Sequence, residues 1–181
     1  MTNAKNVVRL AAFLAVGIVG GWGGAQAQSR AVGYVLPMDV ALEGALEAVQ
    51  TCNANGYAVT ASVVDVSGNQ QVVLRGDRAT VHTKDTAYRK AYTVITMGPI
   101  FQFDRTSRFV ELLAKYPPIA AQSLATTPNV TALAGGVAIK VGDEIVGGIG
   151  IGGSPGGDKD EVCAQAGVVK IQKRLAAVVT R

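Results

Sequence analysis

The sequence contains one histidine, two cysteines and few charged residues, and each of these scarcities excludes a kind of site. The cysteines form no CxxC motif and do not cluster with the histidine, which excludes a zinc site of the Cys/His kind. A Ser-His-Asp triad would depend on His82 alone, and no serine lies in a nucleophile-elbow motif. No close pair of acidic residues suits a glycosidase. The residue chemistry therefore favours a binding protein over an enzyme.

The balance of apolar and charged residues is that of a folded domain. Hydrophobic residues make up 49% of the 181 residues and charged residues 17%, which favours a packed core over disorder. This length fits one domain better than two. The formal net charge is +4, but the basic residues are dispersed and are not interleaved with aromatic residues. We therefore expect no nucleic-acid partner.

The first 27 residues have the pattern of a secretory signal peptide. Lys5 and Arg9 precede the apolar stretch Leu10–Val19, and Ala25-Gln26-Ala27 offers the small-x-small pattern of a cleavage site. A membrane anchor is the alternative, but it needs about 20 apolar residues, more than this stretch provides. The sequence predicts a signal peptide over residues 1–27 and a single domain over 28–181. The mature protein is then periplasmic or secreted, with no membrane span.

Apolar periodicity and turn residues predict a fold made of two hairpins and flanking helices. Hairpins pair antiparallel strands, so the pattern is not that of an alternating βαβ chain. The fold class is α/β in the broad sense, more narrowly α+β, with an antiparallel sheet. The expected elements, in chain order, are a helix over 37–52, strands over 57–66 and 70–75, helices over 80–97 and 105–115, a loop over 119–131, strands over 136–141 and 144–152, and a final helix capped by Asp158 or Asp160.

The two cysteines fall on different predicted helices. Cys52 lies on the apolar face of the first helix, and Cys163 lies beside the apolar face of the last. Export would permit a disulfide between them, which would contribute about 4–5 kcal/mol in the chain-entropy model. Two buried thiols on separate helices are the alternative, and the sequence leaves both open.

His82 stands near the start of the predicted helix over 80–97, for which Thr80 is the expected N-cap. Successive residues of a helix are rotated by 100° about its axis, so the residues of the predicted helix can be assigned to a core face and to a roughly opposite face. We expect the core face to hold Ala87, Ala91, Val94 and Ile95, and the opposite face to hold His82, Thr86, Arg89, Thr93 and Met97. The opposite face then meets water, a pocket or a partner subunit.

Two interpretations of this face remain open. In the first, His82 is an iron ligand and Arg89 or Lys90 lies near an anionic group such as a haem propionate. Tyr88, Tyr92, Tyr116 and Met97 are further possible axial ligands. In the second, His82 is a solvated histidine beside solvated charges.

The predicted strand over 144–152 presents a face almost without side chains. Period two places Ile145, Ile149 and Ile151 on one side, and Val146, Gly148, Gly150 and Gly152 on the other. Such a face allows close approach of a flat ligand or, more simply, of a packed helix. The GxGxxG pattern here is not a dinucleotide site, because it follows a hairpin and no acidic residue lies about 20 residues further on.

The order of these motifs resembles the GlcG/HbpS-like haem-binding family. The stretches that carry the resemblance are Val59–Asn69, Arg89–Thr93, Gly135–Ile139, Glu144–Gly153 and Asp158–Gly167, and the whole covers about residues 38–175. The resemblance implies a profilin-like fold and assembly into homo-oligomers. It also implies haem as a cofactor, with roles in haem or iron handling, haem degradation or redox sensing.

Three functional hypotheses follow from the residues and the resemblance. The first is an exported binder of haem or a related tetrapyrrole, with His82, Thr86, Arg89, Lys90, Thr93, Met97, Gly150 and Gly152 at the site. The second is a small-metabolite binder or catabolic enzyme in which Arg89 and Lys90 bind a carboxylate. The third is an oligomeric scaffold without a ligand.

Overall fold

The computed structural model describes residues 35–179, and side chains as far as residue 177. The predicted signal peptide lies outside these residues. The four strands are β1 (Thr60–Asp65), β2 (Gln70–Arg75), β3 (Gly136–Val141) and β4 (Glu144–Gly152). They form one antiparallel sheet in the order β2-β1-β4-β3, so that one strand of each hairpin lies at the centre. The predicted α+β class and its two hairpins are confirmed.

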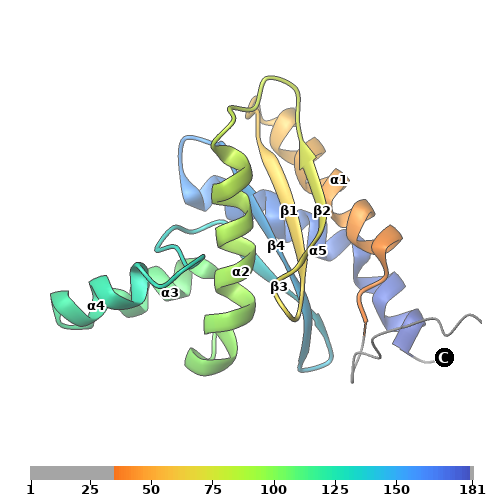
Figure 1. Ribbon diagram of the computed structural model, residues 1–181. Coiled ribbons are helices and arrows are strands. Elements are labelled where there is room, and N and C mark those ends of the chain that lie inside the picture. The colour runs from red at the N-terminus through yellow and green to blue at the C-terminus, as the bar shows by residue number, and fades with distance from the viewer. Residues whose placement is uncertain (1–34, 180–181) are drawn as a thin grey trace, which may run out of the picture. The chain divides into compact units, whose positions relative to one another are not determined.

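Helices cover both faces of this sheet (Figure 1). Helices α1 (Met38–Ala54) and α5 (Gly157–Val179) pack together on one face, and α2 (Thr83–Phe101) crosses the other. None of the helices in the described part of the chain has the length and hydropathy needed to cross a bilayer. The helix order follows the prediction, although α2 begins three residues later than expected and continues through Pro99 to Phe101.

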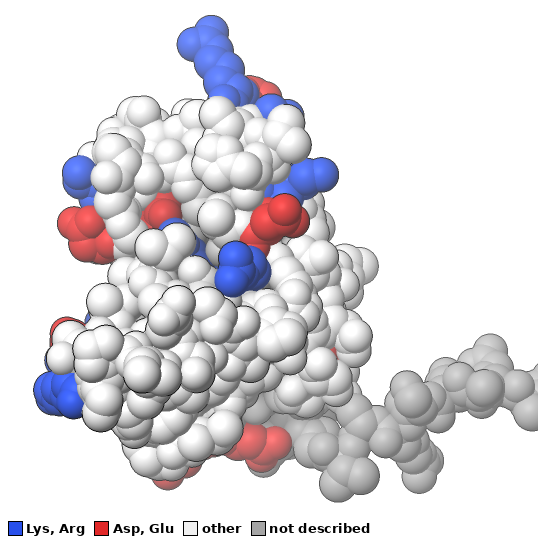
Figure 2. Space-filling model, turned by 60° about the vertical axis from the view of Figure 1, so that its left-hand side comes forward, with Lys and Arg blue, Asp and Glu red and all other residues white. Residues whose placement is uncertain are grey.

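Two short helices, α3 (Thr106–Leu113) and α4 (Pro118–Ala125), reach sideways past α2 (Figure 1). The prediction of a loop over 119–131 was wrong in its first half, where α4 forms. Pro118 occupies the first helical position, where its missing N–H costs nothing and its fixed φ suits a helix. No residue of α4 is buried, which explains why the sequence shows no apolar period there. Figure 2 turns this side toward the viewer, and its lower half carries few charged side chains.

The sheet separates two apolar cores. The α1/α5 side includes Val63, Ile149, Ile151 and the apolar face of α5 that was predicted from sequence, Ala164, Val168, Ile171 and Leu175. The α2 side includes Val64, Val94 and Phe109. Ala87, Ala91, Val94 and Ile95 are all buried, so the predicted core face of α2 is confirmed.

A β-bulge changes which side chains of β4 face each core. Ile139 pairs with Gly147 while Lys140 pairs with Ile145, so Val146 is an extra residue on β4. Because one extra residue reverses the alternation, Val146 joins the α1/α5 core and Ile145 turns to the α2 side. The predicted faces of these two residues were therefore wrong, while those of Ile149 and Ile151 hold.

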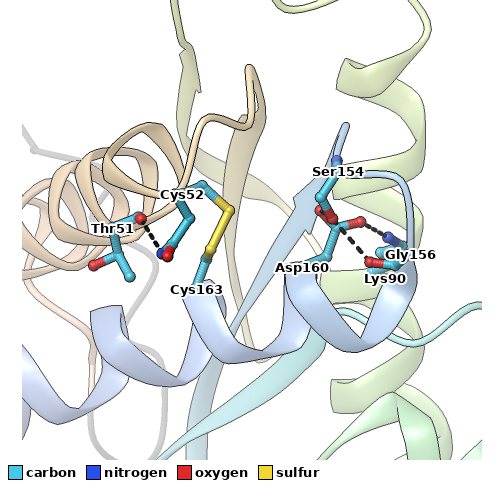
Figure 3. Close-up of a disulfide and its surroundings, with 8 residues drawn as sticks. Thr51, Cys52, Lys90, Ser154, Gly156, Asp160 and Cys163 are labelled. Carbon is cyan, nitrogen blue, oxygen red and sulfur yellow. Dashed lines mark hydrogen bonds and ion pairs between the residues drawn. A yellow bond between two sulfur atoms is a disulfide. The ribbon is translucent and has the colours of Figure 1, made fainter.

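A disulfide joins Cys52 of α1 to Cys163 of α5, with 5.5 Å between their Cα atoms (Figure 3). Of the two alternatives left open by the sequence, the structure contains the bridge. Both cysteines are buried, because the flank of α5 that holds Cys163 is covered by α1. The helices approach closely at Gly44 and Gly167: a Cβ added at Gly167 would lie 2.4 Å from the carbonyl oxygen of Gly44.

Candidate functional site

His82 directly precedes α2 and its side chain is exposed, as predicted. The helix begins after it because Thr83 is anchored to the sheet. The buried Thr83 hydroxyl donates to the carbonyl oxygen of Thr80 at 2.6 Å and lies 2.7 Å from the Thr60 hydroxyl on β1, which must donate to it. The predicted N-cap, Thr80, therefore accepts the hydrogen bond from the Thr83 hydroxyl, and the N-cap position is held by His82. Among the side chains that the structure describes, none forms a hydrogen bond or an ion pair with the His82 imidazole, which is therefore accessible to a ligand.

Thr86 and Arg89 continue the same side of α2 on the next two turns, and both are half-buried. The Thr86 hydroxyl donates to the carbonyl oxygen of Thr83 at 3.2 Å. The Arg89 guanidinium donates from Nη2 to the carbonyl oxygen of Val130. His82 and Arg89 are separated by about 10 Å along the helix axis. The imidazole of His82 and the guanidinium of Arg89 therefore lie at the two ends of one strip along the surface of α2.

Lys90 lies inside the protein. Its side chain is 4% exposed and its Nζ lies 2.5 Å from Oδ2 of Asp160, whose side chain is 3% exposed. The other oxygen of Asp160 accepts hydrogen bonds from the backbone N–H and the hydroxyl of Ser154 (Figure 3). Asp160 thus pairs with Lys90 in addition to lying in the first turn of α5, and the Lys90 ammonium is not free to bind a propionate or another carboxylate.

Thr93 and Met97 are also buried, contrary to the expectation that their face of α2 meets water, a pocket or a partner. The Thr93 hydroxyl donates to the carbonyl oxygen of Arg89 at 2.7 Å and accepts from the backbone N–H of Thr131 at 2.9 Å. Met97 belongs to the core on the α2 side. Thr131, in the segment that follows α4, covers Thr93, so the predicted strip is open only toward the start of α2.

Gly150 and Gly152 face α2, which fills the space above them. A Cβ at Gly150 would lie 2.1 Å from the carbonyl oxygen of Ala87, and one at Gly152 would lie 2.5 Å from Oγ1 of Thr86. Of the two occupants considered for this bare strand face, the packed helix is the one found. The glycines set the depth at which α2 sits and thereby position the start of the helix.

The close contact at Gly150 makes a direct prediction. Gly150→Ala forces a methyl group into the backbone of α2, and we expect it to lower the free energy of unfolding by about 1–3 kcal/mol, toward the upper end. Gly142→Ala is the control, because that turn has open space around a Cβ and only the left-handed φ of +59° to oppose it. Urea unfolding compares the two. A Gly150→Ala variant as stable as the wild type would contradict the packing of β4 against α2.

Tyr88 of α2 is less suited to bind iron than His82. Tyr88 and Tyr92 are half-buried, with ring centroids 5.8 Å apart. Burial raises the pKa of Tyr88, and the neighbouring Tyr92 raises this pKa further. Because a tyrosine binds haem iron as the phenolate, a raised pKa opposes ligation by Tyr88.

A cavity of about 710 Å³ lies at the opposite end of α2, about 27 Å along the helix from His82. Apolar side chains share its wall with two cations, Arg108 and Lys140, and two acids, Asp104 and Asp143. None of its lining residues is His, Cys, Met or Tyr, so it offers no side chain of the types that bind haem iron. No group of three or more His, Cys, Asp or Glu that could hold a metal ion occurs among residues 35–179.

The fold and the site together define a small α+β protein. It has one four-stranded antiparallel sheet between helices, and the exposed imidazole of His82 lies at the start of α2. The family model described as haem degrading protein HbpS-like matches residues 36–169. The chain belongs to this family, and the resemblance inferred from the sequence is confirmed. The sequence matches none of the curated proteins.

Solved structures agree with the family. A double mutant of HbpS from Streptomyces reticuli shares 32% identity with a TM-score of 0.68, over 91% of this chain and 97% of that one. The Klebsiella pneumoniae protein ORFY shares 19% identity with a TM-score of 0.69, over 80% and 96% of the two chains. PduOC, solved as a haem complex, shares 22% identity with a TM-score of 0.65, over 76% and 95%. The last two show the fold alone.

Proposed function

We propose that this chain is an exported haem-binding protein and that His82 supplies the iron ligand. The proposal rests on the imidazole of His82. It is exposed at the start of α2 and has no hydrogen-bond or ion-pair partner among the described side chains. Membership of a family named for haem degradation supports haem as the ligand. So does the PduOC haem complex, which shows that a protein of this fold binds haem.

The residues along this side of α2 fit the chemistry of haem. Imidazole is an established axial ligand of haem iron. Arg89 uses one of the five N–H donors of its guanidinium on Val130, so other donors remain for a propionate carboxylate. Thr86 lies between the two on the helix. When bound, haem would supply an iron centre capable of redox change and of binding small ligands, while His82 and Arg89 would hold and orient it.

Export and the cellular role are part of the same proposal. The disulfide between Cys52 and Cys163 supports an oxidising compartment, because such bonds persist in secreted and periplasmic proteins and are rare in the cytosol. In that compartment we propose a role in haem or iron handling or in redox sensing, by a protein that self-associates. The alternative carboxylate site at Arg89 and Lys90 is disfavoured, because Lys90 is already paired with Asp160.

His82→Ala tests the iron ligand. We expect the variant to lose haem affinity by about tenfold or more and to show an altered Soret band, because the imidazole–iron bond is removed. The matched control is Lys84→Ala, an exposed residue in the first turn of α2 that lies outside the proposed site. A haem spectrum and affinity unchanged in His82→Ala would place the ligand on another residue and contradict this assignment.

A further inference from the structure

The cavity at the end of α2 lies between an apolar wall and a charged turn. Its volume of about 710 Å³ is of the size that small-molecule sites have. Phe101 of α2, Phe103 and Leu112 of α3 line the wall, and all three are half-buried or buried. In Figure 1 the end of α2 and the turn between β3 and β4 lie at the same, lower end of the molecule. The cavity is therefore distant from His82 at the start of α2.

The β-bulge at Val146 adds Ile145 to the lining of this cavity. Lys140 and Ile145 stand directly opposite each other in the β3–β4 pair, so their side chains lie on the same face of the sheet. That face is the α2 side, because Ile145 packs against the core there. Bulges that re-aim a side chain in this way are frequent next to active sites. The bulge thus places an apolar side chain beside the Lys140 ammonium.

Two of the four charged side chains at the cavity have no partner. Arg108 pairs with Glu111, and Asp104 pairs with the arginine that follows it. Lys140 and Asp143 form no ion pair or side-chain hydrogen bond with each other or with any other residue that the structure describes. They lie three residues apart in the turn between β3 and β4. The turn therefore offers one ammonium and one carboxylate to a ligand.

We propose that this cavity binds a free α-amino acid with a large apolar side chain. Its carboxylate would pair with Lys140 and its ammonium with Asp143, while its side chain would lie against the apolar wall. An α-amino acid carries both charges at one end, as the turn carries its own two charges. The C-terminal end of α2, which also borders the cavity, adds a partial negative charge that favours an ammonium group.

Ligands with one charge match this cavity less well. A simple carboxylic acid would leave Asp143 without a partner, and a simple amine would leave Lys140 without one. The four charged side chains of the lining, two basic and two acidic, sum to zero, so the cavity selects neither an anion nor a cation by its net charge. Charge complementarity therefore favours a zwitterion.

Calorimetric titration of the purified protein with three related compounds tests the ligand class. L-Phenylalanine carries both charges, phenylpropionate lacks the ammonium and phenethylamine lacks the carboxylate. We expect saturable binding of one L-phenylalanine per chain. The other two compounds should bind about tenfold or more weakly, because each loses one charged hydrogen-bonding partner.

Lys140→Met and Asp143→Asn test the two assigned side chains. Each should weaken the binding of L-phenylalanine by about tenfold or more, since each removes one charge of the turn. Lys84→Met and Asp85→Asn are the matched controls, because they make the same changes at exposed residues in the first turn of α2, at the other end of the helix. Circular dichroism confirms that all four variants fold.

Three results would each overturn the proposal: no saturable binding of L-phenylalanine, equal affinity for all three compounds, or a Lys140→Met variant that binds as tightly as Lys84→Met. The proposal is independent of haem binding, because His82 lies at the other end of α2. A protein that binds haem but not L-phenylalanine would overturn this inference alone. One that binds L-phenylalanine but not haem would overturn only the proposed function.

Discussion

Replacing Lys90 by methionine is expected to lower the free energy of unfolding by about 3–5 kcal/mol. Methionine keeps much of the length of the side chain, so the main change is loss of the ammonium. Asp160 would be left with a side chain 3% exposed and no counter-ion, and the two hydrogen bonds from Ser154 do not neutralise its charge. Breaking one side of a buried pair is costly because the remaining charge has already lost its water. Urea unfolding at neutral pH measures the change.

Two further variants separate this explanation from simple loss of packing. Lys90→Met combined with Asp160→Leu removes both charges, and we expect it to recover much of the lost stability. Arg108→Ala breaks an exposed pair with Glu111, whose side chains are 63% and 56% exposed, and should cost no more than about 1 kcal/mol. A Lys90→Met variant no less stable than Arg108→Ala would show that the pair is not buried as described.

Removal of the disulfide is expected to destabilise the protein by about 4–5 kcal/mol. The bond joins residues separated by 111 positions, and such a crosslink restricts the unfolded chain strongly. The effect should appear as a lower urea midpoint for the Cys52→Ala, Cys163→Ala double variant. It should also appear when the wild type is unfolded in a reductant.

The double variant is also the control for the reductant. It has no disulfide to reduce, so its midpoint should be the same with and without the reductant. If the reductant leaves the wild-type midpoint unchanged, the purified protein contains two thiols. That result would also remove the structural support for export to an oxidising compartment.

The fold was predictable because its elements have clear local patterns. Ala87, Ala91, Val94 and Ile95 recur at helical spacing, and all four are buried. The turn at Ser67-Gly68-Asn69 is closed by the Asp65 carboxylate, which accepts from the backbone N–H groups of Ser67 and Asn69. Patterns of this kind depend only on neighbouring residues, which the sequence displays directly.

The bulge at Val146 and helix α4 could not be predicted in the same way. A one-residue bulge depends on how β4 pairs with β3, and the alternation within β4 alone gives no sign of it. Helix α4 buries no residue, so its sequence carries no apolar period. Thr93 and Met97 were misplaced because their burial depends on residues further along the chain: Thr131 contacts Thr93, and Met97 belongs to the core that also contains Phe109.

The candidate site was predicted in part. His82 is exposed at the start of α2, but Lys90 was assigned to a ligand although it pairs with Asp160. The sequence did contain evidence for the pairing of Lys90 with Asp160. Asp160 precedes Ala164 and Val168 at intervals of four on the apolar face of α5, and Lys90 borders the core face of α2. Opposite charges on two buried faces indicate an internal ion pair.

Titration of haem into the purified wild-type protein, followed in the Soret band, tests the central claim most directly. The account predicts a saturable shift at a fixed ratio of haem to chain, with the spectrum of a histidine-bound iron. Absorbance that rises in proportion to added haem, with no shift and no saturation, would contradict haem binding by this member of the family.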